Sequence, residues 1–390
     1  MLIFFYIQIR SYYTYKCNNM VYMELENKNK NKNEYIAEGS FGCVFSSKVQ
    51  CKDNKDEDLF IGNNNQYVSK VSVSQPDDKE ILIGKVIIQN IKHYDYYYAP
   101  ILNSCPIDIG VIENEQIQKC KLVSNNNKDN YISSTLKYIG KRNIYDYLDD
   151  NINTDDNTFI KIIIESHLHL VNALEKLLLI EDPIVHYDLK NGNVMFDESY
   201  NVPIIIDFGL SYTHSQLFTS PMNIQSLSNI FYVFYEKYTP WNIEIVILSY
   251  IIQSIAIKDN ININRQILKP YFTNLLQVVD DYVKSFEVFE NDEERTSFSI
   301  SVKDFLHQFQ NKPISAIIDE LRNNWKSWDN FSIAMMYYTY LNYQEKEKLH
   351  DNRFFLSYSK MLKDILLSTP KNIRQLPNNT RNNIISFTRI

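Results

Sequence analysis

The stretch IVHYDLKNGNVMFD at residues 184–197, followed by VPIIIDFGL at residues 202–210, decides the fold of this chain. In the first segment Asp188 precedes Asn193 by five positions, and in the second Asp207 opens the triplet DFG. Apolar residues flank both polar segments, which predicts that each lies at the end of a strand. A DFG triplet alone is weak evidence, but the two segments in this order are highly specific.

These residue types suit the transfer of a phosphoryl group, which depends on positioned charge more than on covalent chemistry. We expect Asp188 to accept the proton of an acceptor hydroxyl and Lys190 to neutralise the moving γ-phosphate. Asn193 and Asp207 are the expected ligands of Mg²⁺. The alternative is that these side chains are solvated turn residues, and the joint pattern argues against it.

Upstream, the segment IAEGSFGCV has the composition of a glycine-rich loop whose backbone N–H groups approach phosphates. Ala37 stands where such a loop has its first glycine, and an ordinary β-hairpin is the alternative interpretation. The residues expected to contact ATP are Ile36, Ala37, Glu38, Gly39, Ser40, Phe41, Gly42, Cys43 and Val44.

The alternating segment YVSKVSV at residues 67–73 predicts a strand that carries Lys70 to the α- and β-phosphates, with Val68 covering the purine. The segment KEILIGKVIIQNI has apolar residues at helical spacing, and Glu80 opens this helix. Glu80 is the candidate partner of Lys70, although an acidic residue in a first helical turn is also favourable to the helix dipole.

The strand expected at residues 131–140 ends in a candidate hinge at residues 137–140. There the backbone of Lys137 and of Ile139 would bond the adenine edge, with Leu136 as the gatekeeper. A strand that simply ends in a glycine turn is the alternative.

Together these motifs resemble the protein kinase superfamily, serine/threonine branch, over roughly residues 35–388 except 212–325. The chain is particularly similar to the divergent serine/threonine-protein kinases of giant nucleocytoplasmic large DNA viruses (mimivirus-like). The shared features are Glu80–Ile87, Ala99–Ile101, Cys105–Ile107, Tyr138–Gly140, His186–Lys190, Trp328–Ser332 and the closing Pro370 and Arg374. The resemblance implies an α+β, two-lobed fold and phosphorylation of serine or threonine on a protein substrate, with ATP and Mg²⁺.

On this interpretation residues 1–34 form a disordered leader and residues 35–390 the kinase domain. The small β-rich N-lobe covers about 35–136, with an Asn-rich loop at 52–66, and the larger helical C-lobe covers 141–390. An insertion of about 212–325 follows the DFG motif and separates it from Asp329, the best match to the aspartate of the Asp-x-Trp-Ser helix. Glu244 is the candidate for the glutamate of the Ala-Pro-Glu motif, and Arg374 for its partner.

In many kinases an arginine precedes the catalytic-loop aspartate and binds a phosphate on the activation segment. Here that residue is Tyr187, which carries no positive charge. The sequence therefore predicts activity without phosphorylation of the candidate sites Ser211, Thr213, Ser215, Thr219 and Ser220.

Bulk properties narrow the function classes. The net charge of −7 is diffuse and no long Lys/Arg block occurs, so nucleic-acid binding is not expected. The apolar run Ile243–Ile257 is interrupted by polar residues, which predicts a buried helix and no membrane span. In the N-terminal apolar stretch Arg10 follows the apolar residues, whereas a signal peptide has its positive charge first, so secretion is not expected.

The five cysteines form no CxxC pair and have no histidines at zinc-finger spacing. This predicts free thiols and a cytoplasmic location, in the host cytoplasm or the virion if the protein is viral. The sequence does not indicate the oligomeric state. Two other functions stay open: a nucleotide-binding pseudokinase scaffold, suggested by Ala37 and Tyr187, and a small-molecule or lipid kinase on the same fold.

Overall fold

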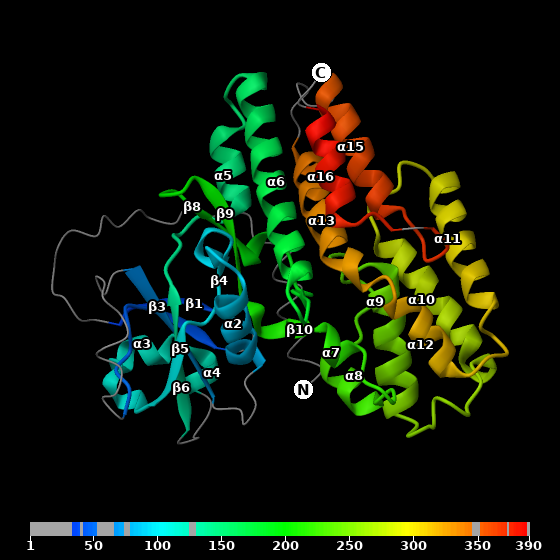
Figure 1. The fold of residues 1–390 in the computed structure, drawn as a ribbon, viewed down its shortest axis with the longest axis horizontal. Helices are drawn as coiled ribbons and strands as arrows, with labels where there is room; N and C mark the ends of the chain where they lie inside the picture. The colour runs from blue at the N-terminus through cyan, green and yellow to red at the C-terminus, as the bar shows by residue number, and fades with distance from the viewer. Residues whose placement is uncertain are drawn as a thin grey trace. The chain divides into compact units, whose positions relative to one another are not determined.

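The computed structural model describes residues 33–39, 42–52, 66–73, 79–124, 130–344, 352–372 and 374–387. It combines an N-terminal antiparallel sheet with a mainly helical C-terminal part, so the fold is mixed α+β (Figure 1). Nearly all of the predicted leader and most of the Asn-rich loop lie outside the described residues. Of the leader, Asn33 and Glu34 are described, and they hydrogen-bond to Ser47 and Ser46.

A five-stranded antiparallel sheet in the order β1-β2-β3-β6-β5 forms the N-terminal part. The predicted strand at 67–73 is confirmed, and it pairs along its whole length with β6. Val71 is fully buried in the core on one face, so the adjacent Lys70 points to the opposite face. The strands are β1 (Tyr35–Glu38), β2 (Cys43–Ser46), β3 (Tyr67–Val73), β6 (Tyr131–Lys137) and β5 (Asn103–Ile107).

Helix α2 (Lys79–Asn90) has the predicted helical spacing, with Ile83 and Ile87 buried. A Cβ atom on Gly84 would lie 2.6 Å from the carbonyl oxygen of Ile101, so glycine permits the close approach of α2 to that backbone. This contact positions the first turn of α2, which carries Glu80. The shorter helices α3 (Asn114–Gln118) and α4 (Lys121–Ser124) lie between β5 and β6 in the chain.

Two disulfides cross-link this part of the chain, Cys43–Cys120 and Cys51–Cys105. The prediction of free thiols is therefore wrong for these four cysteines, and Cys17 lies outside the described residues. The partners are 77 and 54 residues apart and meet only in the folded sheet, so local spacing could not reveal the pairing. Because disulfides persist in oxidising compartments, the argument for a reducing cytosol loses its support.

Short paired strands frame both polar segments. Residues 186–193 lie between β7 (Ile184–Val185) and β8 (Val194–Asp197), and Asp207 directly follows β9 (Val202–Ile206), as the apolar flanks predict. β9 pairs antiparallel with β8 and parallel with β4 (Tyr98–Ala99), while β7 pairs with β10 (Tyr212–Thr213).

The C-terminal part consists of helices whose apolar faces share one core. The long helix predicted at 159–180 is α6 (Asp156–Leu179), which begins after Asp155, whose carboxylate accepts a bond from the Thr158 amide. Helix α13 (Trp328–Tyr343) is buried along most of its length. The others are α5 (Ile144–Asn151), α7 (His214–Leu217), α8 (Ile224–Ile230), α9 (Ile243–Ser249), α10 (Phe272–Ser285), α11 (Asp292–His307), α12 (Ile314–Arg322), α15 (Arg353–Leu366) and α16 (Pro377–Phe387).

The apolar run from 243 to 257 is a buried helix, as predicted. It forms α9 and continues as a π-helix over Tyr250–Ile257. Among the described residues, no helix has both the length and the apolar character needed to cross a membrane.

The buried histidine of α6 leads to a prediction about pH. His167 Nδ1 lies 2.6 Å from the Tyr358 hydroxyl, and burial lowers the pKa of His167 from 6.5 to about 3. Below pH 6.5 the unfolded chain binds a proton that the folded chain excludes. We expect His167 to leave the free energy of unfolding unchanged above this pH and to reduce it by up to about 1.4 kcal/mol per pH unit as the pH falls toward 3.

Urea unfolding between pH 7.5 and about pH 4 measures this slope. His167→Phe should flatten the dependence, whereas His307→Gln, at an exposed position of α11, should not. Equal slopes for the wild type and His167→Phe would contradict the prediction.

Candidate active site

The lysine of β3 lies between two carboxylates. Lys70 Nζ is 2.6 Å from Glu80 Oε2 and 3.0 Å from Asp207 Oδ1. Burial alone would lower the pKa of Lys70, but the charges of Glu80 and Asp207 raise it, so the lysine is a cation. The predicted Lys70–Glu80 pair thus forms, and Asp207 joins it from the end of β9.

The segment between β7 and β8 arranges its polar groups around one carboxylate. Asp188 Oδ2 accepts hydrogen bonds from Lys190 Nζ at 2.8 Å and from Asn193 Nδ2 at 3.0 Å. Asn193 Nδ2 also donates to the Asp188 carbonyl at 2.8 Å. Because the amide nitrogen of Asn193 faces Asp188, its carbonyl oxygen points elsewhere and is suited to a cation.

His186 connects the two motif segments. Its Nε2 lies 2.9 Å from the Ile206 carbonyl oxygen, and its ring meets Phe208 edge-on, with centroids 4.9 Å apart. Burial favours the neutral form of Asp207, but the nearby positive charges, Lys70 first, lower its pKa. The structure therefore brings together six predicted residues: Lys70, Glu80, Asp188, Lys190, Asn193 and Asp207.

Helix α13 fixes the backbone of this site. Asp329 Oδ2 accepts a bond from the His186 amide at 2.7 Å, and Oδ1 accepts one from the Tyr187 amide at 2.9 Å. Tyr187 and Asp207 both have positive φ angles, 73° and 61°, which cost about 1–3 kcal/mol each in residues other than glycine. The predicted Asp329 thus lies where it stabilises one of the two strained residues.

A buried ion pair joins α9 to the segment before α16. Arg374 Nε lies 2.7 Å from Glu244 Oε1, and Arg374 Nη2 lies 2.5 Å from Glu244 Oε2. The side chains are 4% and 0% exposed, respectively. The two residues predicted as partners are therefore in contact, although 130 positions separate them.

The first part of the predicted insertion lies against residues 186–193, the candidate catalytic loop. β10 pairs with β7, and Trp241 Nε1 donates to the Tyr187 carbonyl oxygen at 2.9 Å. Helices α10, α11 and α12 come later, between Glu244 and Asp329. The bounds of the insertion, about 212–325, stay a prediction.

Tyr187 lies in an aromatic cluster with Tyr212, Phe231 and Trp241, at ring-centroid distances of 5.0–6.0 Å. It is 2% exposed, and burial raises its pKa. Packing of neutral rings therefore holds the segment that follows Asp207 against the catalytic loop.

Two of the candidate phosphorylation sites, Ser211 and Ser215, make hydrogen bonds within this packed segment while they are unmodified. Ser211 is fully buried and donates to the His186 carbonyl oxygen, and Ser215 donates through its amide and its hydroxyl to Asp182.

We expect alanine at Ser211, Thr213, Ser215, Thr219 and Ser220 together to change the rate of phosphoryl transfer only slightly. Single-turnover kinetics on the five-alanine variant test this, with its melting temperature as the control. A large loss of rate in a folded variant would contradict it.

The glycine-rich segment forms the β1–β2 hairpin. A Cβ on Gly42 would lie 2.6 Å from the Val71 carbonyl oxygen, so a glycine is needed where the hairpin meets β3, directly before β2 pairs with it. Glu38 Oε1 accepts a bond from the Leu122 amide, so its side chain caps α4. Ile36, Ala37, Gly39, Cys43 and Val44 lie in or beside these strands, whereas Ser40 and Phe41 lie outside the described residues.

The candidate hinge links the sheet to the β8–β9 pair. Lys137 ends β6, and its Nζ lies 3.1 Å from Asp197 Oδ2. Ile139 packs against the cluster formed with Ala99 and Ile204. Val68 lies two residues before Lys70 on β3, and so shares its face of the sheet.

Sequence reasoning missed the tyrosines near Asp188. The Tyr238 hydroxyl lies 2.6 Å from Asp188 Oδ1. Burial, together with the charges of Asp188 and Asp207, raises the pKa of Tyr232 to about 12. The repeated spacing of Tyr232, Tyr235 and Tyr238 was visible in the sequence, but nothing local indicated that it faces the catalytic loop.

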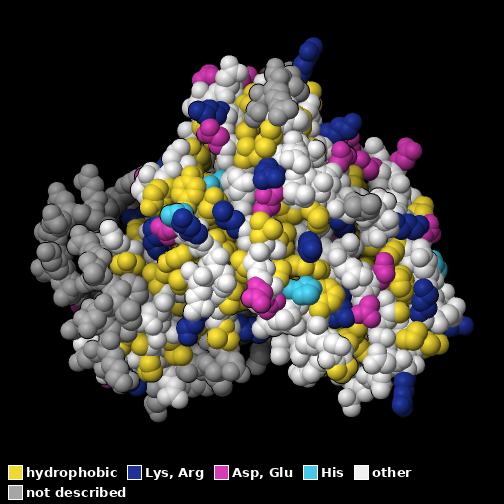
Figure 2. Space-filling view, in the orientation of Figure 1, with side chains coloured by type: hydrophobic (Ala, Val, Ile, Leu, Met, Phe, Trp, Pro, Cys, Tyr) yellow, Lys and Arg dark blue, Asp and Glu magenta, His cyan; other side chains and the backbone are white. Residues whose placement is uncertain are grey.

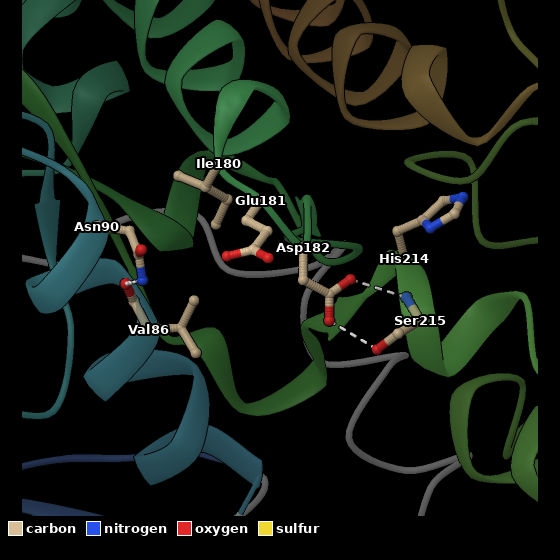
Figure 3. A pocket seen from close by; sticks show the side chains of 7 residues that line it. All are labelled: Val86, Asn90, Ile180, Glu181, Asp182, His214 and Ser215. Atoms are coloured by element: carbon tan, nitrogen blue, oxygen red, sulfur yellow. Dashed lines mark hydrogen bonds between the residues drawn. The ribbon is translucent and has the colours of Figure 1, made fainter.

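A cavity of about 480 Å³ lies elsewhere, and none of the predicted catalytic or ATP-binding residues lines it (Figure 3). Val86 and Asn90 of α2 line one side, and Asp182 lies opposite, bonded to Ser215. On the face drawn in Figure 2, Lys and Arg side chains alternate with Asp and Glu without forming one large charged patch.

Few side chains near the candidate site could bind a metal ion. In the described part of the chain, no three His, Cys, Asp or Glu side chains gather closely enough to hold a metal. Asp207 and the carbonyl oxygen of Asn193 offer hard oxygen ligands of the kind Mg²⁺ prefers. Such a site keeps waters and takes further ligands from substrate phosphates, which fits a pair of protein ligands.

Comparison with known proteins gives two kinase-like relatives, both from Dictyostelium discoideum. One is described as a "probable inactive serine/threonine-protein kinase", samkD, and is 26% identical over 153 residues. The other is described as a "probable serine/threonine-protein kinase", samkC, and is 44% identical over 43 residues.

These matches cover 39% and 11% of this chain. They span only 26% and 5% of the length of the relatives. No family model matches the chain. The similarity supports a relationship to the protein kinase superfamily, and the mixed α+β structure is compatible with the two-lobed arrangement expected of it.

Proposed function

We propose that this protein transfers the γ-phosphate of ATP to serine or threonine of protein substrates. The observation that carries the proposal is that two clusters of polar side chains lie close together. One is Lys70 with Glu80 and Asp207, and the other is Asp188 with Lys190 and Asn193. Lys190 bonds Asp188 at 2.8 Å, and its charge also lowers the pKa of Asp207, which in turn bonds Lys70.

Each residue has a chemical role in this proposal. Asp188 accepts the proton of the acceptor hydroxyl and orients its oxygen toward the phosphate. Lys190 neutralises the charge of the transferred group, and Lys70, positioned by Glu80, holds the α- and β-phosphates. The backbone N–H groups of the glycine-rich segment bind the phosphates in this proposal, while Val68 and the backbone of Lys137 and Ile139 bind the adenine.

A magnesium ion held by Asp207 and Asn193 would neutralise charge on the phosphates. Asp207 is kept ionised by its cationic neighbours, and Asn193 is fixed by its bonds to Asp188. Both side chains therefore have oxygen atoms that could bind a cation.

A nucleotide-binding pseudokinase scaffold is the second candidate. It is favoured by the relative described as inactive and by Ala37 in the glycine-rich segment. Against it, every residue with a direct chemical role in transfer is present, and the lysine, both aspartates and the asparagine make the contacts described above. A small-molecule or lipid acceptor is the third alternative, since a fold does not determine the acceptor.

The deciding experiment incubates the protein with radiolabelled ATP and Mg²⁺ on generic protein acceptors, followed by phosphoamino-acid analysis. Labelled phosphoserine or phosphothreonine, reduced about 10²–10⁴-fold in Asp188→Asn, would support the proposal. ATP binding without transfer would favour the scaffold, and label in lipid or small molecules alone would favour the third alternative.

The similarity to giant-virus kinases stays a prediction, since both relatives found are from Dictyostelium. A cytoplasmic location also stays a prediction, and the two disulfides argue against a strongly reducing compartment.

A further inference from the structure

The two carboxylate oxygens of Asp188 accept hydrogen bonds from different parts of the chain. Oδ2 accepts bonds from Lys190 and Asn193, both within the catalytic loop. Oδ1 accepts a hydrogen bond from the Tyr238 hydroxyl at 2.6 Å, and the two residues are 50 positions apart in the sequence. Oδ1 is therefore the oxygen left for an acceptor hydroxyl, and the chain supplies a hydroxyl there itself.

Trp241, which follows Tyr238 in the chain, anchors the segment that carries it. The Trp241 amide donates to the Tyr238 carbonyl oxygen at 3.1 Å, and the two rings lie 4.9 Å apart. Trp241 in turn donates from Nε1 to the Tyr187 carbonyl oxygen. The Tyr238 phenol is thus held beside Asp188 by packing against Trp241, which is itself bonded to Tyr187.

We propose that Tyr238 is a phosphate acceptor and that the chain phosphorylates it within the same molecule. The inference rests on the proposed phosphoryl transfer from ATP. The bond between the γ-phosphorus and the oxygen that bridges to ADP breaks, and a bond from this phosphorus to Tyr238 Oη forms. The phenolic proton passes to Asp188 Oδ1, and ADP leaves with the electrons of the broken bond.

The geometry distinguishes Tyr238 from the other hydroxyls near the site. Burial and the charges of Asp188 and Asp207 raise the pKa of Tyr232. The oxygen of Tyr238, by contrast, lies within hydrogen-bond distance of Asp188, the proposed proton acceptor. Ser211 and Ser215 bond a backbone carbonyl and Asp182 instead. A site that holds a phenol against Asp188 also accommodates tyrosine as an acceptor, beside serine and threonine.

The test uses the full chain, treated with phosphatase and then incubated with ATP and Mg²⁺ at two protein concentrations tenfold apart. Mass spectrometry maps the phosphate, and a generic protein acceptor is assayed in parallel. We expect about one phosphate per chain on Tyr238, with a half-time that does not change on dilution because donor site and acceptor belong to one molecule. Tyr238→Phe should lose this phosphate, and Tyr235→Phe, which removes a neighbouring phenol, should retain it.

Three results would overturn the inference, and they are distinguishable. Transfer to the generic acceptor with Tyr238 unmodified would leave the proposed function standing and give Tyr238 a positioning role only. A half-time about tenfold longer after tenfold dilution would show phosphorylation between molecules. Absence of transfer to either acceptor would overturn both proposals.

Discussion

Asp207→Asn and Lys70→Met are each expected to lower the rate of phosphoryl transfer about a thousandfold or more. Both residues supply charge beside the phosphates, and removal of one preorganised charge or donor in an active site costs about 10²–10³ in rate or more. Asp207→Asn retains an oxygen that can accept the bond from Lys70, so its fold should be unaffected. Single-turnover kinetics with saturating ATP measure the loss.

Matched controls separate chemistry from folding. Lys161→Met removes a lysine whose side chain is 71% exposed on α6, and Asp292→Asn removes an aspartate that is 98% exposed on α11. Both should retain the wild-type rate, and circular dichroism should show that all four variants are folded. A folded Asp207→Asn variant with nearly wild-type activity would remove the kinase assignment.

Arg374→Met is expected to reduce the free energy of unfolding by about 3–5 kcal/mol, because it leaves Glu244 charged and buried without its partner. Removing both charges in Glu244→Gln/Arg374→Met should cost less than Arg374→Met alone, since no unpaired charge then stays buried. Urea denaturation of the two variants and the wild type measures the difference.

Arg295→Met is the control for this pair. Arg295 pairs with Asp292 in an exposed turn of α11, and such pairs contribute about 0–1 kcal/mol. If Arg374→Met proved no more destabilising than Arg295→Met, the buried pair would have no structural role.

The sequence predicted best those parts in which residue type and local spacing carry the information. The alternation around Lys70 specified β3, and helical spacing specified α2 and α6. The apolar segments beside Asp188 and Asp207 correctly indicated short strands. Even the distant partners Glu244 and Arg374 could be named, because the family pattern links them.

Features that depend on long-range packing could not be predicted. The partner of Cys43 is Cys120, and only the folded sheet brings the two together. Tyr238 contacts Asp188 from a segment that Trp241 anchors to Tyr187, and no spacing rule encodes that contact. Residues 212–241 carry no familiar motif, so the sequence did not indicate that β10 pairs with β7 or that Trp241 bonds the Tyr187 carbonyl oxygen.

The two disulfides are nested, since the loop closed by Cys51 and Cys105 lies inside the one closed by Cys43 and Cys120. A single backbone cleavage between residues 52 and 104 therefore leaves the two pieces covalently joined. The Asn-rich stretch between β2 and β3 lies within both loops, so a protease that cuts there would nick the protein without releasing β1 and β2 from β3. Electrophoresis of the nicked protein would show one band without a reducing agent and two bands with it.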